Sequence, residues 1–323
     1  MEPLPKGANF IRAKTLWEIG LHIAGNPLTP YGGNRDMCIT VGSGGSAQFT
    51  PWLRMATGSA IIAEQVAKGE IDMAFVNPSA LLTQAYRGVG LFKEKLPVRI
   101  VATYPSWDRF VMMVHPRTGL RSVKDIKDKR YPLKVSVRED PTHSTLVLID
   151  QAFALHGFSL ADLQSWGGQL VVCGSPFDRR RMEPLRSGTL DAVFDEGIKT
   201  WLPEALESGY EPLELAQSEF DALGKLGWRK VVLPAARFAR LGRDRHAIDF
   251  GGWPIYTYAA LPDKVAYDVC AAIAARDAEM PWEEGAYHGL AQLGSDTEET
   301  PIDVPLHPGA ERWYKEHARG TAR

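Results

Sequence analysis

The stretch Val41-Gly42-Ser43-Gly44-Gly45-Ser46-Ala47 follows a short apolar run at residues 37–41 and leads into a segment with helical periodicity at residues 49–68. A strand that breaks into glycines and then opens a helix leaves backbone N–H groups unpaired, with the positive end of the helix dipole behind them. Such a turn is a seat for an anion. The alternative is a tight turn in which the glycines only permit unusual backbone angles.

The segments that follow alternate between strand and helix patterns. An apolar run at 71–76 ends in Asn77-Pro78-Ser79, which caps a predicted helix at 80–86. Further strands are predicted at 98–103, 110–114, 133–137, 170–173, 192–194, 228–233 and 251–258, and helices at 13–24, 145–155, 178–186, 263–276 and 282–290, with Ser144 as a helix cap. This alternation predicts a parallel sheet with helices on both faces, and ligands outside the carboxyl ends of its strands.

Composition describes an ordinary globular chain long enough for two domains. It has 323 residues, of which 45% are hydrophobic and 24% charged, and a formal net charge of −2. The net charge is too small to attract nucleic acid or a membrane surface, so nucleic-acid binding is not expected. No apolar segment is long enough to span a membrane, so membrane insertion is not expected either. Cys38, Cys173 and Cys270 lie far apart and are predicted to be reduced. As written, the chain is expected to be cytoplasmic, or periplasmic if an export signal has been removed.

Several common motifs are missing from the sequence. There is no Gly-x-x-x-x-Gly-Lys-[Ser/Thr], the glycine turn does not complete Gly-x-Gly-x-x-Gly, and no Gly-x-Ser-x-Gly occurs. The eight histidines are scattered singly, without zinc-ligand spacing. We therefore expect no cofactor and no metal.

Charged residues at predicted strand ends are the candidates for chemistry. Asp195 and Glu196 are an acid/base pair, partners of Lys199 or of a ligand amine, or simply solvated acids. Arg138, directly after a strand, is a predicted anion clamp because guanidinium binds carboxylate bidentately. The run Arg179-Arg180-Arg181 is interpreted as a solvated helix face. His143 is a ligand donor, a proton carrier or a helix cap.

Five segments together resemble the TAXI family of TRAP-transporter solute-binding proteins. In chain order they are VGSGGS (41–46), VAKGEIDMAFV (66–76), TGLRSVKDI (118–126), GTLDAVF (188–194) and LHPGAERWY (306–314). The resemblance implies a type II periplasmic-binding-protein fold, with two three-layer α/β lobes, two crossing segments and a ligand cleft. The implied division is 1–105 for the first part of lobe 1, 106–252 for lobe 2, and 253–323 for the return to lobe 1 and the C-terminal helices. It also implies TRAP membrane permease subunits as partners.

The sequence departs from that family in two places. The family begins with an export signal and a glycine-rich first ligand loop, of which only residues 6–11 remain. Where the family has a neutral Gly-Ser-Gly-Thr turn, this chain has Arg138-Glu139-Asp140-Pro141-Thr142-His143-Ser144-Thr145, which introduces charged and titratable groups.

Two functions follow from these observations. The leading hypothesis is a binding protein for a small organic acid, such as a dicarboxylate, keto acid or aromatic carboxylate, held in the cleft as the lobes close. The alternative is a cofactor-free cytoplasmic decarboxylase or isomerase on the same scaffold, using His143, Arg138 and Glu196. The predicted ligand-binding residues are Ser43, Gly44, Gly45, Ser46, Asn77, Ser79, Trp107, Arg138, His143, Ser144, Thr145, Asp195, Glu196, Trp253 and Tyr256.

Overall fold

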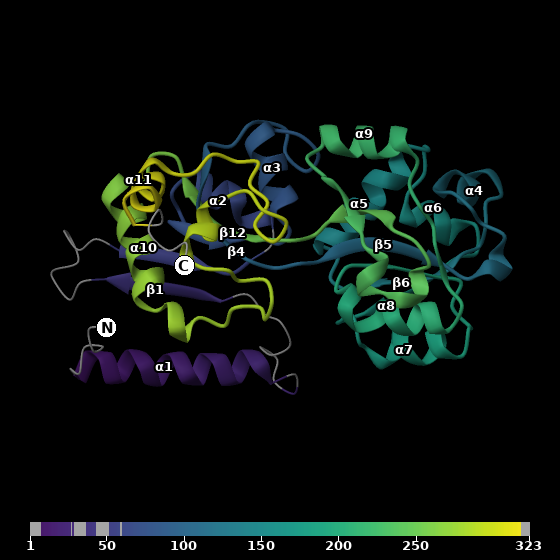
Figure 1. Cartoon of the computed structure of the whole chain (residues 1–323), viewed down its shortest axis with the longest axis horizontal. Helices are drawn as coiled ribbons and strands as arrows, with labels where there is room; N and C mark the ends of the chain where they lie inside the picture. Colours follow the sequence, from purple (N-terminus) through teal and green to yellow (C-terminus); the bar gives the residue numbers. More distant parts are fainter. Residues whose placement is uncertain (1–7, 27, 29–36, 43–51, 59, 318–323) are drawn as a thin grey trace.

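The fold is α/β, with two mixed sheets in two lobes that lie side by side (Figure 1). The structure is a computed structural model and describes residues 8–26, 28, 37–42, 52–58 and 60–317. The sheet of lobe 1 has the order β1 (Cys38–Gly42), β2 (Trp52–Ala56), β3 (Met73–Phe75), β12 (Trp253–Tyr258) and β4 (Val98–Tyr104). The helices of this lobe are α1 (Ala8–Gly25), α2 (Ala63–Ala67), α3 (Ser79–Arg87), α10 (Asp263–Ala275) and α11 (Pro308–His317).

The sheet of lobe 2 has seven strands. Their order is β10 (Lys230–Leu233), β11 (Arg245–Asp249), β5 (Arg109–Val114), β8 (Ala192–Asp195), β6 (Lys134–Arg138) and β7 (Gln169–Cys173), while β9 (Glu211–Pro212) pairs with β5. The helices are α4 (Val123–Asp128), α5 (Ser144–Ala154), α6 (Leu160–Ser165), α7 (Arg179–Arg186), α8 (Ile198–Glu207) and α9 (Gln217–Lys225).

Parallel pairing is confined to part of each sheet. Strand β2 is parallel to β3, and β6 is parallel to both β7 and β8. Strands β5 and β12, which follow the segments crossing between lobes, are antiparallel to their neighbours. The predicted alternation is therefore confirmed in outline, but the prediction of a parallel sheet is wrong, because the crossing strands and the consecutive pairs β1–β2 and β10–β11 are antiparallel.

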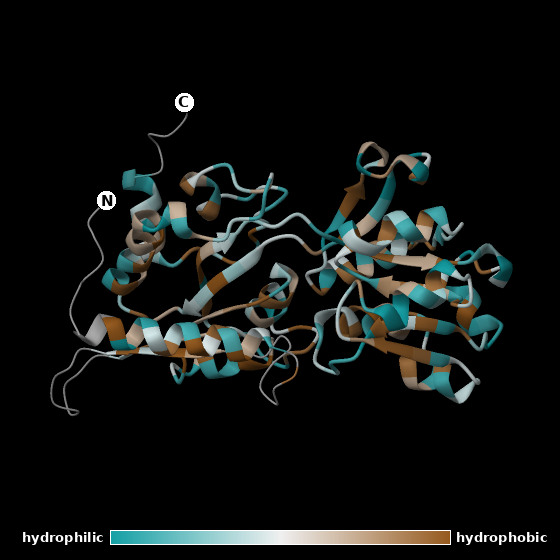
Figure 2. Cartoon of the chain, turned by 90° about the horizontal axis from the view of Figure 1, so that it is seen from below, coloured by the Kyte–Doolittle hydropathy of each residue, from teal (hydrophilic) through white to brown (hydrophobic). Residues whose placement is uncertain are grey.

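Both faces of the lobe 2 sheet are buried. Along β5, Phe110, Met112 and Val114 belong to one apolar core, while Val111 and Met113 belong to another. A strand turns successive side chains to opposite faces, so this split shows helices packed on each side. Figure 2 shows the hydrophobic stretches concentrated in the strands of this lobe, with hydrophilic residues on the outer helices.

The glycine turn does not join a strand to a helix as predicted. Strand β1 is antiparallel to β2, with Gly42 opposite Trp52, so residues 42–52 connect two antiparallel strands. The next α-helix, α2, begins only at Ala63, beyond β2. Pairing of β2 with β1 and β3 overrides the helical pattern of residues 52–56, because strand pairing depends on tertiary contacts. Helix α2 therefore begins too far along the chain to place its dipole directly behind the glycines.

Three smaller predictions also change. Strand β1 is largely exposed instead of buried, since it forms the edge of the sheet. The cap of α5 is His143, whose side chain accepts a hydrogen bond from the backbone N–H of Thr145, instead of Ser144. In place of the predicted helix at 282–290, the chain is irregular with a turn at 284–286, and a 3-10 helix begins at Leu290 and ends at Gly294.

Candidate functional site

The facing ends of the two sheets can be identified from the crossing segments. Strand β4 ends at Tyr104, and the chain enters lobe 2 at Arg109, the start of β5. It returns from β11 to β12, which starts at Trp253 opposite Tyr104. In lobe 2, Asp195 at the end of β8 pairs with Val111 near the start of β5. The candidate site therefore has one wall at Tyr104 and Trp253, and a second wall at Asp195.

The lobe 2 wall is built around the guanidinium of Arg138. Strands β6 and β8 are parallel neighbours, so Arg138 and Asp195, their last residues, come together. The Arg138 Nε donates to Asp195 Oδ1 at 3.0 Å, one terminal nitrogen contacts Glu196, and the other donates to the Gly174 carbonyl at 3.3 Å. Arg138 and Asp195 are both buried. The structure thus brings together three residues singled out from the sequence.

A second guanidinium, that of Arg181, reaches the same carboxylate from α7. Its Nη1 lies 2.5 Å from Asp195 Oδ2, and its Nε donates to Ser136 Oγ at 2.9 Å. Arg181 is 0% exposed, so the prediction that this arginine belongs to a solvated face is wrong. Arg181 shares the sheet-facing side of α7 with Met182 and Leu185, which are also buried. Asp195 therefore balances two buried cations.

Glu196 contacts a second acid, the half-buried Asp108. The Asp108 carboxylate accepts from the backbone N–H groups of Gly197, at 2.7 Å, and Ile198, at 3.3 Å, at the start of α8. Burial raises the pKa of Asp108. Burial, reinforced by the charges of Asp108 and Asp195, raises the pKa of Glu196 to about 8. Glu196 is therefore an acid that keeps its proton near neutral pH.

His143 lies beside this acid, at the start of α5. Its Nδ1 accepts from the Thr145 N–H at 3.3 Å, and its Nε2 lies 3.9 Å from Glu196 Oε1. Burial and the nearby charge of Arg138 lower the pKa of His143, so the ring is neutral at pH 7. Ser144 and Thr145 are buried in the first turn of α5.

The lobe 1 wall is a hydrophobic pocket of about 980 Å³. It lies at the ends of β2, β3 and β4 and the start of β12, and its side chains include Trp17, Phe75, Asn77, Thr103, Trp253 and Trp282. The rings of Tyr104 and Trp253 are stacked with centroids 5.0 Å apart and planes 15° apart. The ring of Trp282 also lies beside Tyr104, with the two ring centroids 5.4 Å apart. Asn77 and Trp253 were predicted site residues, whereas Tyr104 and Trp282 were missed.

Glu283 links the two walls. It follows Trp282 in the chain, accepts from Ser106 Oγ at 2.8 Å, and forms an ion pair with Lys199 of α8. Lys199 was a predicted partner of Asp195 or Glu196, but it pairs with Glu283 instead. The aromatic pocket and the charged wall therefore meet at this ion pair.

Three other predicted residues, Trp107, Tyr256 and Ser79, do not line the lobe 1 pocket. Trp107 is 2% exposed and is covered by Arg237, whose guanidinium carbon lies 4.0 Å from the ring centroid. Tyr256 is 0% exposed and belongs to the apolar core. Ser79 is buried in the first turn of α3. The last group lies outside the described residues: Ser43, Gly44, Gly45 and Ser46.

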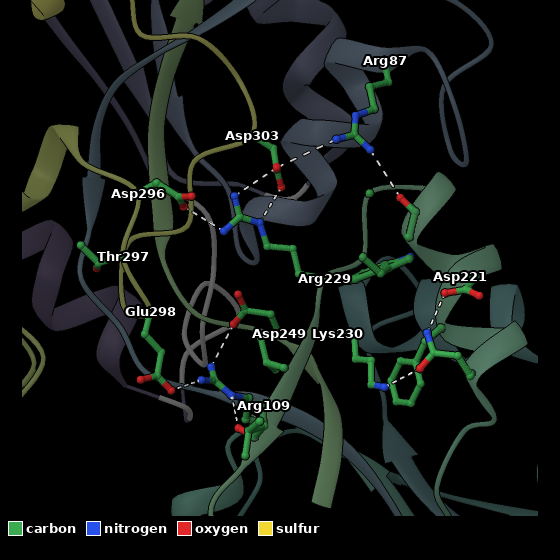
Figure 3. A pocket seen from close by; sticks show the side chains of 17 residues that line it. Arg87, Arg109, Asp221, Arg229, Lys230, Asp249, Asp296, Thr297, Glu298 and Asp303 are labelled. Carbon is green, nitrogen blue, oxygen red and sulfur yellow. Dashed lines mark hydrogen bonds and ion pairs between the residues drawn. The ribbon is translucent and has the colours of Figure 1, made fainter.

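A separate charged groove of about 960 Å³ lies beside the crossing segments (Figure 3). Its arginines are already paired: Arg229 lies between Asp296 and Asp303, at 2.8 and 2.9 Å, and Arg109 contacts Asp249 at 2.9 Å and also Glu298. Because these charges are matched within the chain, the groove has little unbalanced charge for a ligand. These ion pairs join residues of lobe 2 to residues that follow the return to lobe 1.

Arg181 and Asp108 are the functional candidates that sequence reasoning missed in lobe 2. Arg181 stands in a run of three arginines, which favoured a solvated face. Its spacing of four residues from Leu185 places both residues on one side of the helix, and this spacing could have indicated that Arg181 is buried. Asp108 gave no local signal because the helix that it caps begins 90 residues later.

Within the described ranges, no group of three or more His, Cys, Asp or Glu side chains is arranged to hold a metal ion. The helices of the described part are all too short or too polar to cross a bilayer.

No family model matches the chain. Solved structures with distant similarity include the unliganded L-cystine solute receptor of Neisseria gonorrhoeae, at 13% identity and a TM-score of 0.28, covering 67% of this chain and 66% of that one. This chain thus spans slightly less than two thirds of that receptor. Lactococcal OpuAC complexed with glycine betaine matches at 11% identity and a TM-score of 0.36, covering 80% and 82%. The desulfurization enzyme DSZB matches at 14% identity and a TM-score of 0.27, and the match covers 77% of this chain and 78% of that enzyme.

Proposed function

We propose that this protein binds a small organic acid between its two lobes. We take residues 1–105 with 253–323 as one lobe and 106–252 as the other, hinged at the two crossing segments. The ligand carboxylate would lie at Arg138, and closure would bring the Trp253 wall over the rest of the molecule. Such a protein would serve as a TRAP-type solute receptor working with membrane permease subunits, or as a cytoplasmic relative of those receptors.

The observation that carries this proposal is the charge balance around Arg138. Two buried guanidiniums, of Arg138 and Arg181, share one carboxylate, Asp195. The other partner of Arg138, Glu196, has a pKa of about 8 and is therefore mostly uncharged at pH 7. The negative charge of Asp108 faces the N-terminus of α8. An incoming carboxylate would supply the charge that neutral Glu196 does not, in the bidentate geometry that guanidinium favours.

Thermal stabilisation and calorimetric titration with acetate, succinate, pyruvate and benzoate at pH 7 test this proposal. We expect at least one acid to bind, and Arg138→Gln to weaken binding roughly tenfold or more because a charge-assisted pair is lost. Arg179→Gln is the matched control, since Arg179 is exposed on the same lobe. Glu196→Gln, which keeps the neutral form, should retain binding. Loss of binding in Glu196→Gln would contradict the proposed charge balance.

A second function is favoured by the approach of His143 to Glu196. The 3.9 Å between His143 Nε2 and Glu196 Oε1 places a neutral imidazole beside a protonated acid. In a cofactor-free decarboxylation, the C–C bond to the carboxylate would break, CO₂ would leave, and Glu196 would protonate the carbon that keeps the electron pair. In an isomerisation, the pair would move one proton between two carbons.

Incubation of the same acids with the protein in D₂O separates the two functions. Release of CO₂ or incorporation of deuterium into the acid, lost in His143→Ala and in Glu196→Gln with thermal stability retained, would support an enzyme. Binding without either product would identify a receptor.

A further inference from the structure

The lobe 1 pocket narrows the class of acid that this site takes. We infer that the ligand is a monocarboxylate with a flat aromatic body of one or two fused rings, whose body occupies the lobe 1 pocket while its carboxylate meets Arg138. The inference rests on the proposed function and specifies its ligand. It favours aromatic acids over small dicarboxylates and keto acids.

Size and polarity are the first support. The pocket encloses about 980 Å³, and the described residues that line it include no charged side chain. Ala102, Ile255 and Ile273 are among the lining residues, and a second apolar hollow of about 510 Å³ shares Ile255 and Ile273 with the pocket. A second carboxylate placed there would lose its hydration without gaining a cation. Apolar ring surface would gain free energy in proportion to the area removed from water.

The aromatic row is the second support. Trp253 is stacked on Tyr104 on one side, yet the residue remains 37% exposed, so part of the indole is available to a ligand. The Tyr104 hydroxyl donates to the Pro281 carbonyl, and Trp282 Nε1 donates to Asp277 Oδ1 at 2.9 Å. Because these hydrogen bonds hold the rings before any ligand arrives, little side-chain entropy is lost when a further ring stacks on them.

Thr103 supplies a third observation. It lines the pocket and is 0% exposed, and its hydroxyl has no hydrogen-bond partner among the described residues. A buried hydroxyl without a partner costs free energy. A ring carrying one hydroxyl group would satisfy it, which points to a hydroxylated aromatic acid.

A series of contacts connects the surroundings of the apolar pocket with those of Arg138. Trp282 lines the pocket, and the next residue, Glu283, pairs with Lys199 on the second residue of α8. Helix α8 starts directly after Glu196 and Gly197, beside Arg138. A carboxylate at Arg138 and a ring in the pocket would therefore lie at the two ends of this series of contacts.

Calorimetric titration with 2-naphthoate, succinate and acetate at pH 7 tests the inference on the full chain. We expect 2-naphthoate to bind at least roughly tenfold more tightly than succinate or acetate, because only its rings bury apolar surface in the pocket. Trp253→Leu should weaken the affinity for 2-naphthoate roughly fivefold or more, because a stacking contact is lost, and should leave the affinity for acetate unchanged. Trp166→Leu, a partly buried tryptophan of lobe 2, is the matched control and should change neither.

Thr103→Val gives a second, independent measurement. This substitution keeps the shape of the side chain but removes its hydroxyl. We therefore expect it to weaken the affinity for 6-hydroxy-2-naphthoate and to leave the affinity for 2-naphthoate unchanged. If succinate binds as tightly as 2-naphthoate and Trp253→Leu has no effect, the inferred ligand class is wrong while acid binding stands. If 2-naphthoate binds equally well to Arg138→Gln, the inferred position of the carboxylate is wrong and the proposed function loses its anchor. If no acid binds, both are overturned.

Discussion

The two walls of the proposed interlobe site are stabilised by different interactions. In lobe 2, Arg138, Arg181 and Asp195 are buried and each depends on its neighbours for charge balance. In lobe 1, Tyr104 and Trp253 are stacked at a partly open pocket and carry no charge. Removing one member of a buried charge network leaves another without its counter-ion, whereas removing one ring loses only its contacts. The lobe 2 wall should therefore be sensitive to substitution in the absence of ligand, and the lobe 1 wall mainly in its presence.

The largest expected effect is that of Asp195→Ala. The substitution leaves two buried guanidiniums without their shared carboxylate, and we expect the free energy of unfolding to fall by about 3–5 kcal/mol. Urea denaturation measures the change. Asp128→Ala is the control, because Asp128 forms an exposed ion pair with Lys124 and its loss should cost less than about 1 kcal/mol. Equal losses in the two variants would remove the distinction between a buried network and a surface pair.

The next effect is the pH dependence contributed by Glu196. Its pKa is about 8 in the folded protein, against an ordinary value of 4.5. Between these values the unfolded chain releases the proton while the folded protein keeps it, so the stabilisation present below pH 4.5 is lost as pH rises toward 8. We expect a loss on the order of 2 kcal/mol, since relaxation and water entry reduce the effect of a buried charge.

Urea denaturation of the wild type and Glu196→Gln from pH 4 to pH 9 measures this contribution as the difference between the two curves. The glutamine variant cannot titrate at this position and should lack the decline. A difference that rises with pH would show that Glu196 is stabilised as the carboxylate, which would also contradict the proposed charge balance at Arg138.

The smallest expected effect on stability is that of Trp253→Leu in the free protein. Loss of the stack with Tyr104 should lower the free energy of unfolding by about 0.5–1.5 kcal/mol. The same urea experiment measures it beside Asp195→Ala. A loss as large as that of the aspartate variant would mean that the lobe 1 wall is a structural core instead of a binding surface.

The sequence identified part of the lobe 2 wall because its residues follow strand patterns. Arg138, Asp195 and Glu196 stand at predicted strand ends, and parallel strands bring such ends to one edge. The sequence did not show that these residues pair with one another, because an ion pair depends on strand order. Arg181 was misassigned for the same reason: whether a helical arginine is buried depends on what faces it.

The aromatic residues show a different limit. Trp253 and Tyr256 were both predicted to cover a ligand, but only Trp253 lines the pocket, together with Ile255. Side chains alternate along a strand, so Tyr256, which directly follows Ile255, lies on the opposite face and belongs to the core. Alternation within β12 could have excluded one of the two residues, but not chosen which.

The sequence by itself determined most of the helices and strands and their alternation, because hydrophobic periodicity and helix caps are local properties of the chain. Only the tertiary structure decided that residues 52–56 are a strand paired with β1 and β3, that Asp195 lies between two guanidiniums, and that Asp108 caps α8. Strand pairing and charge balance join residues far apart in the chain. Their outcome is set by which surfaces the folded lobes bring into contact.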